Sequence, residues 1–173
     1  EKLKSYLSKI TKFENGQTIN KNTGRPIKAL VVMHAFGLVA FIKELQEVCD
    51  NFGLKLIEDA AESLGSKLGD SQTGTFGDIG VVSFNGNKII TTGGGGAVIT
   101  KNEDFAKKAK HLVNQAKVAH PFEFIHDEVG FNYRMPNINA ALGLAQFENL
   151  DLYIEKKREL HKKYESIFSV NQY

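Results

Sequence analysis

Residues 27–59 read IKALVVMHAFGLVAFIKELQEVCDNFGLKLIED, and this stretch decides the fold of the chain. Its first eight residues, 27–34, are mostly apolar and predict a buried strand. Residues 41–52 place apolar side chains at helical spacing, and Gly53 follows them as a common helix stop. Residues 54–59 predict a second strand. Strand, helix and strand in this order form a βαβ unit, whose two strands are parallel.

The same alternation of strands and helices continues through the rest of the chain. We expect further strands at 79–84 and 96–100, and helices at 2–10, 103–116, from near Pro136, and from about 152 to 168. The polar segment 11–26 is expected to be a loop, and 117–135 to be irregular. This pattern predicts an α/β fold with a mostly parallel central sheet flanked by helices.

Composition excludes several classes of protein. The chain has 173 residues, 42% of them hydrophobic and 24% charged, so it can form a core. Its formal net charge of +2 argues against nucleic acid as the main partner. The single cysteine, Cys49, lies in a helical pattern, excludes an internal disulfide and suits a reducing compartment.

The sequence also argues against a membrane protein. The most apolar stretch, Ala29 to Ile42, is too short to span a bilayer and contains His34 and Gly37. The charged amphipathic start, EKLKSYLSKI, does not read as a signal peptide. We therefore expect a cytoplasmic protein with no membrane partner. Because the first residue is not methionine, we also expect an upstream portion.

Polar segments follow three of the predicted strands. His34 ends the first, EDAAES occupies 58–63 after the second, and SFNGNK occupies 83–88 after the third. Ligands of parallel α/β sheets bind at the carboxyl ends of the strands, so these segments predict a site. His34 either lines that site or is a half-buried histidine with satisfied hydrogen bonds.

Generic motifs do not identify the ligand. No phosphate-loop motif or nucleophile elbow is present, and the glycines 93–96 precede a strand rather than the helix of a dinucleotide site. The run His-Asp-Glu at 126–128 reads as a solvated loop rather than a metal site. Asn85-Gly86 is a strong hairpin signal, which leaves open a hairpin between 81–84 and 88–92. We predict no metal ion.

Three longer blocks carry a specific resemblance. They are IEDAAESLGS (57–66), TGTFGDIGVVSFNGNKIITTGGGGAVIT (73–100) and DEVGFNYRMPNINAALGLAQFENLD (127–151). In this order they resemble the DegT/DnrJ/StrS family of pyridoxal phosphate (PLP) dependent sugar-nucleotide aminotransferases. The resemblance runs from about Ile27 to the last helix. It implies a fold-type I PLP-dependent transferase, of which this chain is a large-domain fragment.

The resemblance also implies the catalytic residues. Lys88 matches the lysine that holds PLP as a Schiff base and later moves a proton, and a buried neutral amine suits both tasks. Asp59 matches the aspartate that pairs with the pyridine nitrogen and keeps it protonated. Glu62 occupies the position of a side chain near the ring hydroxyl of the cofactor.

Further residues are implied to bind the phosphate group. Ser83 matches a serine that donates to the PLP phosphate, and Asn132 matches an asparagine that reaches the phosphate in the other subunit of a homodimer. Arg134 is left unassigned. In this interpretation Asn85-Gly86 belongs to a loop that carries Lys88, and the glycines 93–96 let the backbone pass close to cofactor and partner.

The expected activity follows from the closest-looking branch of the family. Phrases such as SFNGNKIITTGGGG resemble enzymes that move an amino group, from glutamate, to C4 of a UDP-linked 4-keto-6-deoxy-N-acetylhexosamine, on routes to bacillosamine or legionaminic acid. The apolar run 38–41 departs from the polar residues usual there. We expect residues 1–150 to be a partial PLP-binding domain and 151–173 a charged helix leading to a small domain.

Two alternatives remain. One is a truncated or non-catalytic homologue that keeps the fold. The other is a PLP-dependent sugar dehydratase of the same fold. Such dehydratases characteristically lack the lysine, so Lys88 counts against this second alternative.

Overall fold

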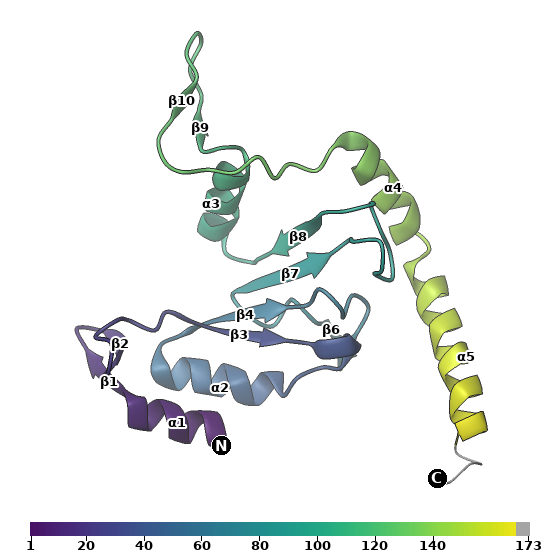
Figure 1. Ribbon diagram of the computed structural model, residues 1–173, viewed down its shortest axis with the longest axis horizontal. Helices are drawn as coiled ribbons and strands as arrows, with labels where there is room; N and C mark the ends of the chain where they lie inside the picture. Colours follow the sequence, from purple (N-terminus) through teal and green to yellow (C-terminus); the bar gives the residue numbers. More distant parts are fainter. Residues whose placement is uncertain (169–173) are drawn as a thin grey trace. The chain divides into compact units, whose positions relative to one another are not determined.

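The computed structural model describes residues 1–168 and divides the chain into two units (Figure 1). The first unit comprises residues 1–82 and 97–133, and the second comprises 83–96 and 134–173.

A four-stranded sheet is the centre of the first unit. Its strand order is β3 (Ala29–Met33), β4 (Lys55–Asp59), β7 (Ile79–Ser83) and β8 (Gly96–Ile99). The pairs β3·β4 and β4·β7 are parallel, and Figure 1 shows β8 running opposite to β7. The predicted α/β class with a mostly parallel sheet is confirmed.

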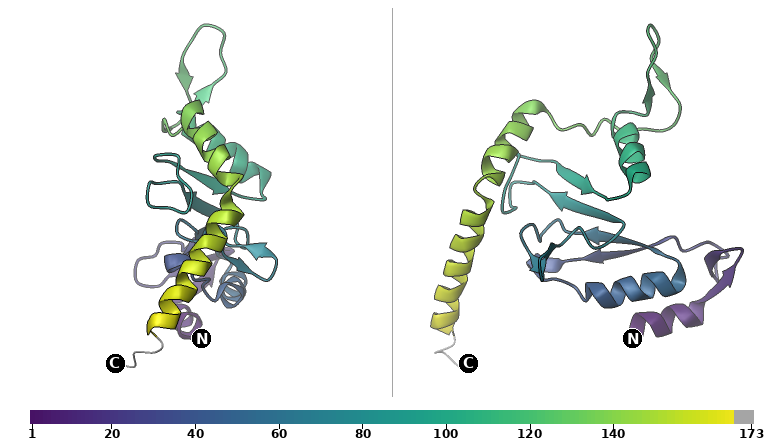
Figure 2. Two further views of the ribbon diagram at one scale, coloured as in Figure 1. Left: turned by 90° about the vertical axis from the view of Figure 1, so that its right-hand side faces the viewer. Right: turned by 180° about the vertical axis from the view of Figure 1, so that it is seen from behind.

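The core of the first unit lies between the sheet and two helices, α1 (Lys2–Ile10) and α2 (Ile42–Phe52), which Figure 2 shows from further sides. Its buried side chains are Leu7, Ile42, Val48, Cys49, Leu54 and Leu56. Helix α2 ends at Gly53, which adopts the left-handed conformation expected of a helix stop (φ 61°). Burial raises the pKa of the Cys49 thiol, in keeping with a packed side chain.

The prediction of a loop at 11–26 is wrong. Strands β1 (Thr11–Glu14) and β2 (Gln17–Asn20) form an antiparallel hairpin there. The turn consists of Asn15 and Gly16, whose φ angles are 50° and 75°. An Asn-Gly pair with positive φ at both positions is the preferred two-residue hairpin turn, so the signal was present but obscured by polar strands.

Helix α3 spans Glu103–Val113 and is shorter than predicted. Gln115 and Ala116 have φ angles of 64° and 51°, which a right-handed helix does not allow. The following segment is irregular as expected, apart from a short antiparallel pair of β9 (Lys117–Val118) and β10 (Ile125–His126). Three small elements were not predicted: η1 (Ala35–Gly37), β5 (Lys67–Leu68) and β6 (Ser71–Gln72).

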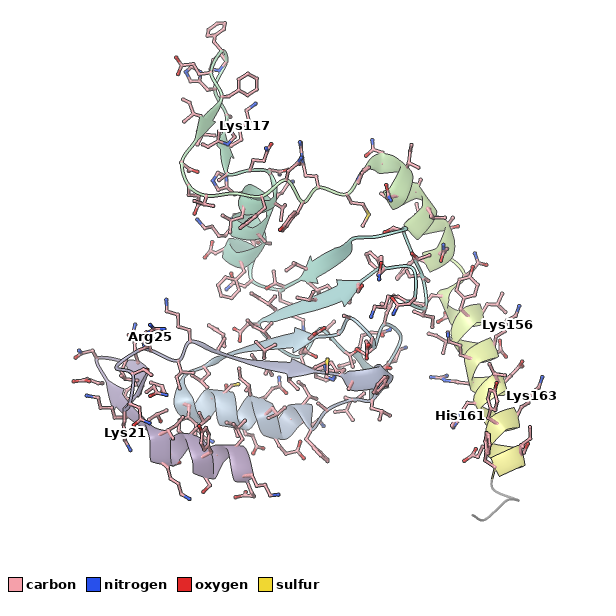
Figure 3. The ribbon with its side chains drawn as sticks, viewed as in Figure 1. Lys21, Arg25, Lys117, Lys156, His161 and Lys163 are labelled. Carbon is pink, nitrogen blue, oxygen red and sulfur yellow. The ribbon has the colours of Figure 1, made fainter. Side chains whose placement is uncertain are left out.

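The second unit contains one loop and two helices, α4 (Asn137–Phe147) and α5 (Leu150–Phe168). Both helices were predicted, although α5 begins slightly earlier than expected. Charged side chains project from α5, among them Lys156 and Lys163 (Figure 3). Within residues 1–168, no helix combines the length and apolar character that crossing a bilayer requires.

Candidate functional site

The carboxyl ends of β3 and β4 meet at one edge of the sheet. In the parallel register Met33 lies opposite Asp59, and Asp59 lies opposite Val81 of β7. His34 directly follows β3, and its backbone N–H donates to Asp59 O at 3.0 Å. The expectation that polar segments gather at this edge is confirmed for His34 and for residues 58–63.

Asp59 is the last residue of β4 and is partly buried. Its Oδ1 accepts a hydrogen bond from Ala61 N at 3.1 Å. Within residues 1–168 no lysine, arginine or histidine forms an ion pair with this carboxylate. A carboxylate at a strand end that no cation among residues 1–168 neutralises can accept a hydrogen bond from a cationic group of a ligand.

Glu62 fixes the loop that follows β3. Its Oε2 accepts a hydrogen bond from Phe36 N at 2.8 Å. Phe36 adopts a left-handed conformation (φ 54°, ψ 25°) that costs a non-glycine residue energy, and its side chain is 90% exposed. Gly37 O accepts a hydrogen bond from Ser66 Oγ at 2.7 Å, which fastens the same loop a second time.

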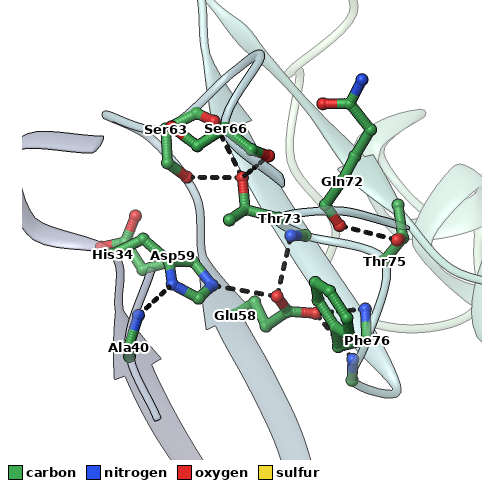
Figure 4. A network of polar contacts seen from close by, with 12 residues as sticks. His34, Ala40, Glu58, Asp59, Ser63, Ser66, Gln72, Thr73, Thr75 and Phe76 are labelled. Carbon is green, nitrogen blue, oxygen red and sulfur yellow. Dashed lines mark hydrogen bonds and ion pairs between the residues drawn. The ribbon is translucent and has the colours of Figure 1, made fainter. Parts of the chain in front are cut away.

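The side chain of His34 is part of a buried polar network rather than the wall of an open site (Figure 4). His34 and Glu58 are both 0% exposed, and His34 Nε2 lies 2.9 Å from Glu58 Oε2. Of the two alternatives for His34, the satisfied buried histidine is therefore the one observed. Sequence reasoning missed Glu58, although a charged residue at an inward position of a buried strand was a usable signal.

The loop that contains Ser83 and Lys88 belongs to the second unit. It is closed at its ends by a hydrogen bond from Phe84 N to Gly95 O at 2.9 Å. Thr92 N donates back to Phe84 O at 3.0 Å, so residues 88–92 do not form the strand that a hairpin on Asn85-Gly86 requires. That alternative is wrong, and a wide loop carries the lysine.

Within this loop, Ser83 and Lys88 both contact Asn85. Ser83 Oγ accepts a hydrogen bond from Asn85 N at 3.3 Å, which leaves the hydroxyl hydrogen available for an acceptor. Lys88 is half-buried, and its backbone N–H donates to Asn85 O at 3.0 Å. These two contacts connect Ser83 and Lys88 to the same residue of the loop.

Helix α4 holds the far side of the loop. Gln146 receives a hydrogen bond from Thr91 N at 2.9 Å and donates one to Thr91 O at 3.0 Å. Asn139 donates to Thr92 O. An added Cβ at Gly143 would lie 2.6 Å from Thr92 Cγ2, so a glycine is needed for this close packing.

At two of the four positions 93–96, the backbone conformation itself favours glycine. Gly93 and Gly95 adopt φ angles of 79° and 96°, which side chains disfavour. A side chain at Gly95 would also meet Met135 Cε at 3.1 Å. The glycines therefore turn the loop back toward β8, and an approach to cofactor or partner stays a prediction.

Asn132 lies on the exposed segment after β10. It forms an isolated antiparallel bridge with Asn114, and Gly130 packs against Gln115 so closely that a Cβ would lie 2.2 Å from its carbonyl carbon. The segment is thereby fixed to the end of α3. Arg134 is exposed in the second unit.

The side chains of 126–128 divide between two places. His126 Nδ1 lies 2.7 Å from Gln115 O. Asp127 and Glu128 both approach His111, at 2.7 and 3.5 Å from its Nε2. Glu128 pairs with Lys108. The hydrogen bond to His111 holds the pKa of the Asp127 carboxyl below its usual range. These contacts fasten the segment onto α3.

The structure thus groups the expected residues in two sets. Asp59, Glu62 and Asn132 belong to the first unit, with Asp59 and Glu62 close to the same strand end. Ser83 and Lys88 share one loop of the second unit.

The mostly parallel α/β architecture is that of the fold-type I PLP-dependent transferases. Solved structures of that class match this chain. The chain belongs to the DegT/DnrJ/EryC1/StrS aminotransferase family, whose model matches residues 7–173. Aminotransferases of this family depend on PLP.

Individual relatives cover most of this chain. EpsN of Bacillus subtilis, a putative pyridoxal phosphate-dependent aminotransferase, is 43% identical over 146 residues, which are 84% of this chain and 37% of EpsN. GDP-perosamine synthase of Vibrio cholerae is 43% identical over 148 residues, 86% of this chain and 39% of that enzyme.

The structure of Helicobacter pylori PseC, an aminotransferase involved in the biosynthesis of pseudoaminic acid, superposes with a TM-score of 0.81. It is 31% identical, and the match covers 90% of this chain and 41% of PseC. The chain therefore spans about two fifths of the length of these relatives.

Proposed function

We propose that the protein containing this chain is a PLP-dependent aminotransferase that moves an amino group to a nucleotide-linked keto sugar, with glutamate as the donor. The proposal rests above all on one observation. Asp59 ends β4 as a partly buried carboxylate without a cationic partner in residues 1–168, in a chain of this family that also keeps Lys88.

Each residue has a distinct task in this proposal. Asp59 would hold the ring nitrogen in its protonated form, and bound PLP would supply the electron sink for the substrate carbon. Lys88 would hold the cofactor covalently and, once released, carry a proton between substrate and cofactor carbons. The Ser83 hydroxyl would donate to the phosphate, and Glu62 would hold the loop beside the ring hydroxyl.

The sugar substrate is proposed as a 4-keto-6-deoxy hexose that is aminated at C4. The resemblance noted in the sequence favours a UDP-linked N-acetylhexosamine, and UDP-4-amino-4,6-dideoxy-N-acetyl-β-L-altrosamine transaminases of Campylobacter jejuni and Helicobacter pylori are 32% and 31% identical. A GDP-linked sugar is the second candidate, because GDP-perosamine synthases reach 43% identity. Parallel assays with both keto sugars would decide between them.

The proposal includes a cytoplasmic homodimer in which Asn132 reaches the phosphate in the neighbouring subunit's site. Lys88→Ala and Asn132→Ala subunits would then regain activity when mixed, because one of the two shared sites is intact. Failure to regain any activity on mixing would contradict a shared site. The division into residues 1–150 and 151–173 stays a prediction.

The central experiment maps the cofactor. PLP is added to the longest natural form of the protein, the product is reduced with borohydride, and its peptides are mapped. A pyridoxyl group on Lys88 is expected, and Lys88→Ala should not carry it. An adduct elsewhere, or one unchanged in Lys88→Ala, would overturn the assignment and favour a non-catalytic homologue.

The same preparation addresses the dehydratase alternative. With an amino donor and a keto sugar, a transaminase yields an amino sugar and an oxo acid in equal amounts. Loss of a sugar hydroxyl without transfer of nitrogen would support the dehydratase instead.

A further inference from the structure

Glu58 is a buried carboxylate whose hydrogen-bonding capacity is filled by the surrounding chain. Its Oε2 accepts from His34 Nε2 at 2.9 Å and from Gly74 N at 2.8 Å. Its Oε1 accepts from Phe76 N at 2.7 Å and from Gly77 N at 2.6 Å. Four N–H donors around one carboxylate connect three segments that are far apart in the sequence (Figure 4).

Glu58 and Asp59 are neighbours on β4 and point to opposite faces of the sheet. Leu56 and Glu58 are buried on the side of α2, at 2% and 0% exposure. Side chains alternate along a strand, so Asp59 faces the other side. The hydrogen bonds of Glu58 therefore hold the end of β4 on the face toward α2, and the side chain of Asp59 lies on the opposite face.

His34 connects the two acidic neighbours directly. Its backbone N–H donates to Asp59 O at 3.0 Å, while its side chain contacts Glu58. Its Nδ1 accepts a hydrogen bond from Ala40 N at 3.1 Å, so the ring hydrogen must sit on Nε2 and point to Glu58. One side chain thereby fixes the end of β3, the loop to Ala40 and the end of β4.

We propose that Glu58 and His34 are positioning residues for the cofactor, which act through Asp59. This inference rests on the proposed function, because it concerns how Asp59 meets the ring nitrogen. The Glu58–His34 contact fixes the backbone of Asp59 and hence the direction of its carboxylate. Loss of that contact lets the strand end shift and weakens the pairing with the ring.

Two variants of His34 distinguish the effect of its contact with Glu58 from the effect of replacing a buried ring. The amide nitrogen of His34→Gln falls near the position of Nε2 and can still donate to Glu58. The amide of His34→Asn falls near Nδ1, so it can accept from Ala40 but does not reach Glu58. Both replace the ring by a polar amide, and they differ in which contact is kept: His34→Gln keeps the one to Glu58, and His34→Asn keeps the one to Ala40.

The control for general loss of stability lies at the opposite end of the unit. Thr18 is 4% exposed, and its hydroxyl donates to Phe52 O at the end of α2. Thr18→Ala removes a buried hydrogen bond and should lower the melting temperature without touching the strand ends.

The test uses the longest natural form of the protein and measures PLP affinity and the visible circular dichroism of bound PLP, each at a temperature where the variant is folded. We expect His34→Asn to raise the dissociation constant by about ten-fold, the lower end of the losses seen when partners that orient metal ligands are removed, and to change the dichroism. His34→Gln should restore both to near the wild-type values. Thr18→Ala should change neither. Should His34→Asn not fold, Glu58→Gln serves in its place.

The outcomes separate this inference from the proposed function. If wild-type protein forms the adduct on Lys88 but all variants bind PLP with equal affinity and dichroism, the positioning role is refuted and the function stands. If His34→Asn, His34→Gln and Thr18→Ala weaken binding in proportion to their melting temperatures, Glu58 and His34 only stabilise the fold. If wild-type protein forms no adduct, both fail.

Discussion

Replacement of Gly80 by alanine should be among the most damaging small changes in the first unit. The segment after β6 passes over β7 at Gly80, where Gly74 contacts it. Glu58 accepts hydrogen bonds from the backbone of the same segment. A Cβ at Gly80 would lie 2.0 Å from Gly74 O and 2.7 Å from Gly74 Cα. Carbon and oxygen atoms rarely approach closer than about 3.3 Å, so the overlap is roughly 1.3 Å. The backbone of Gly74 or of residue 80 has to move to relieve it.

The size of the loss in unfolding free energy depends on which atoms have to move to make room for the Cβ. Overpacking by added methyl groups costs about 1–3 kcal/mol, and a backbone overlap belongs at the upper end. Alanine recovers about 0.4–1 kcal/mol by restricting the unfolded chain. The free energy of unfolding should therefore fall by about 2–3 kcal/mol, which lowers the melting temperature by about 4–12 °C.

Gly86→Ala is the matched control for Gly80→Ala. A Cβ there meets no atom within 4 Å, and the residue does not require a positive φ. Its effect should stay within about 0.5 kcal/mol. Urea unfolding of both variants, with the slope m compared to confirm the same transition, measures the difference. Equal midpoints for the two variants would show that the chain does not pass β7 as closely as described.

Two further changes probe electrostatics and the lysine loop. Burial raises the pKa of the Asp78 carboxyl, but hydrogen bonds from Lys55 Nζ at 2.8 Å and Leu56 N at 2.9 Å outweigh it, so the pKa lies below its usual value. The stability from this carboxylate is fully present above its pKa in the unfolded chain, about 4, and is lost as the pH falls through its lower pKa in the folded chain. The difference in free energy of unfolding between wild type and Asp78→Asn, measured in urea, should therefore shrink below about pH 4. An advantage independent of pH would exclude this ionisation as its source. Gln146→Ala removes both hydrogen bonds to Thr91 and should speed amide exchange across 84–95 while leaving the first unit unchanged; equal exchange rates would mean that α4 does not hold the loop.

The regular elements could be predicted because their signals are local. The βαβ unit of β3, α2 and β4 follows from apolar periodicity over 27–59 and from Gly53, and its observed bounds differ by one or two residues. The hairpin at Thr11–Asn20 was missed because its strands are polar and rest on a two-residue turn. Asn85-Gly86 carries the same turn signal without forming a hairpin, because Phe84 pairs with Gly95 and Thr92 instead.

The candidate site could be predicted in part. Asp59 and Lys88 were found because their surrounding residues resemble a family, and the structure places them at a strand end and in a loop. The role of Glu58 could not be predicted from local pattern, because its partners come from His34 and from Gly74 to Gly77. Those contacts depend on how segments 24 residues upstream and 16 to 19 residues downstream fold back.

In the proposed function, the adjacent carboxylates of Glu58 and Asp59 give one strand a stabilising and a chemical role. Glu58 is fully buried and accepts hydrogen bonds from four N–H groups, so both of its carboxylate oxygens are satisfied by the surrounding residues. Asp59 receives one side-chain hydrogen bond, from Ala61 N, and keeps acceptor capacity for a ligand. Exchange of the two residues in the variant Glu58→Asp, Asp59→Glu keeps net charge and composition. Because the shorter side chain at 58 cannot reach both His34 and Gly77, we expect this variant to lose stability and cofactor affinity together, whereas Asp59→Asn alone should lose affinity and keep its melting temperature. Equal melting temperatures for the exchange variant and wild type would contradict the structural role of Glu58.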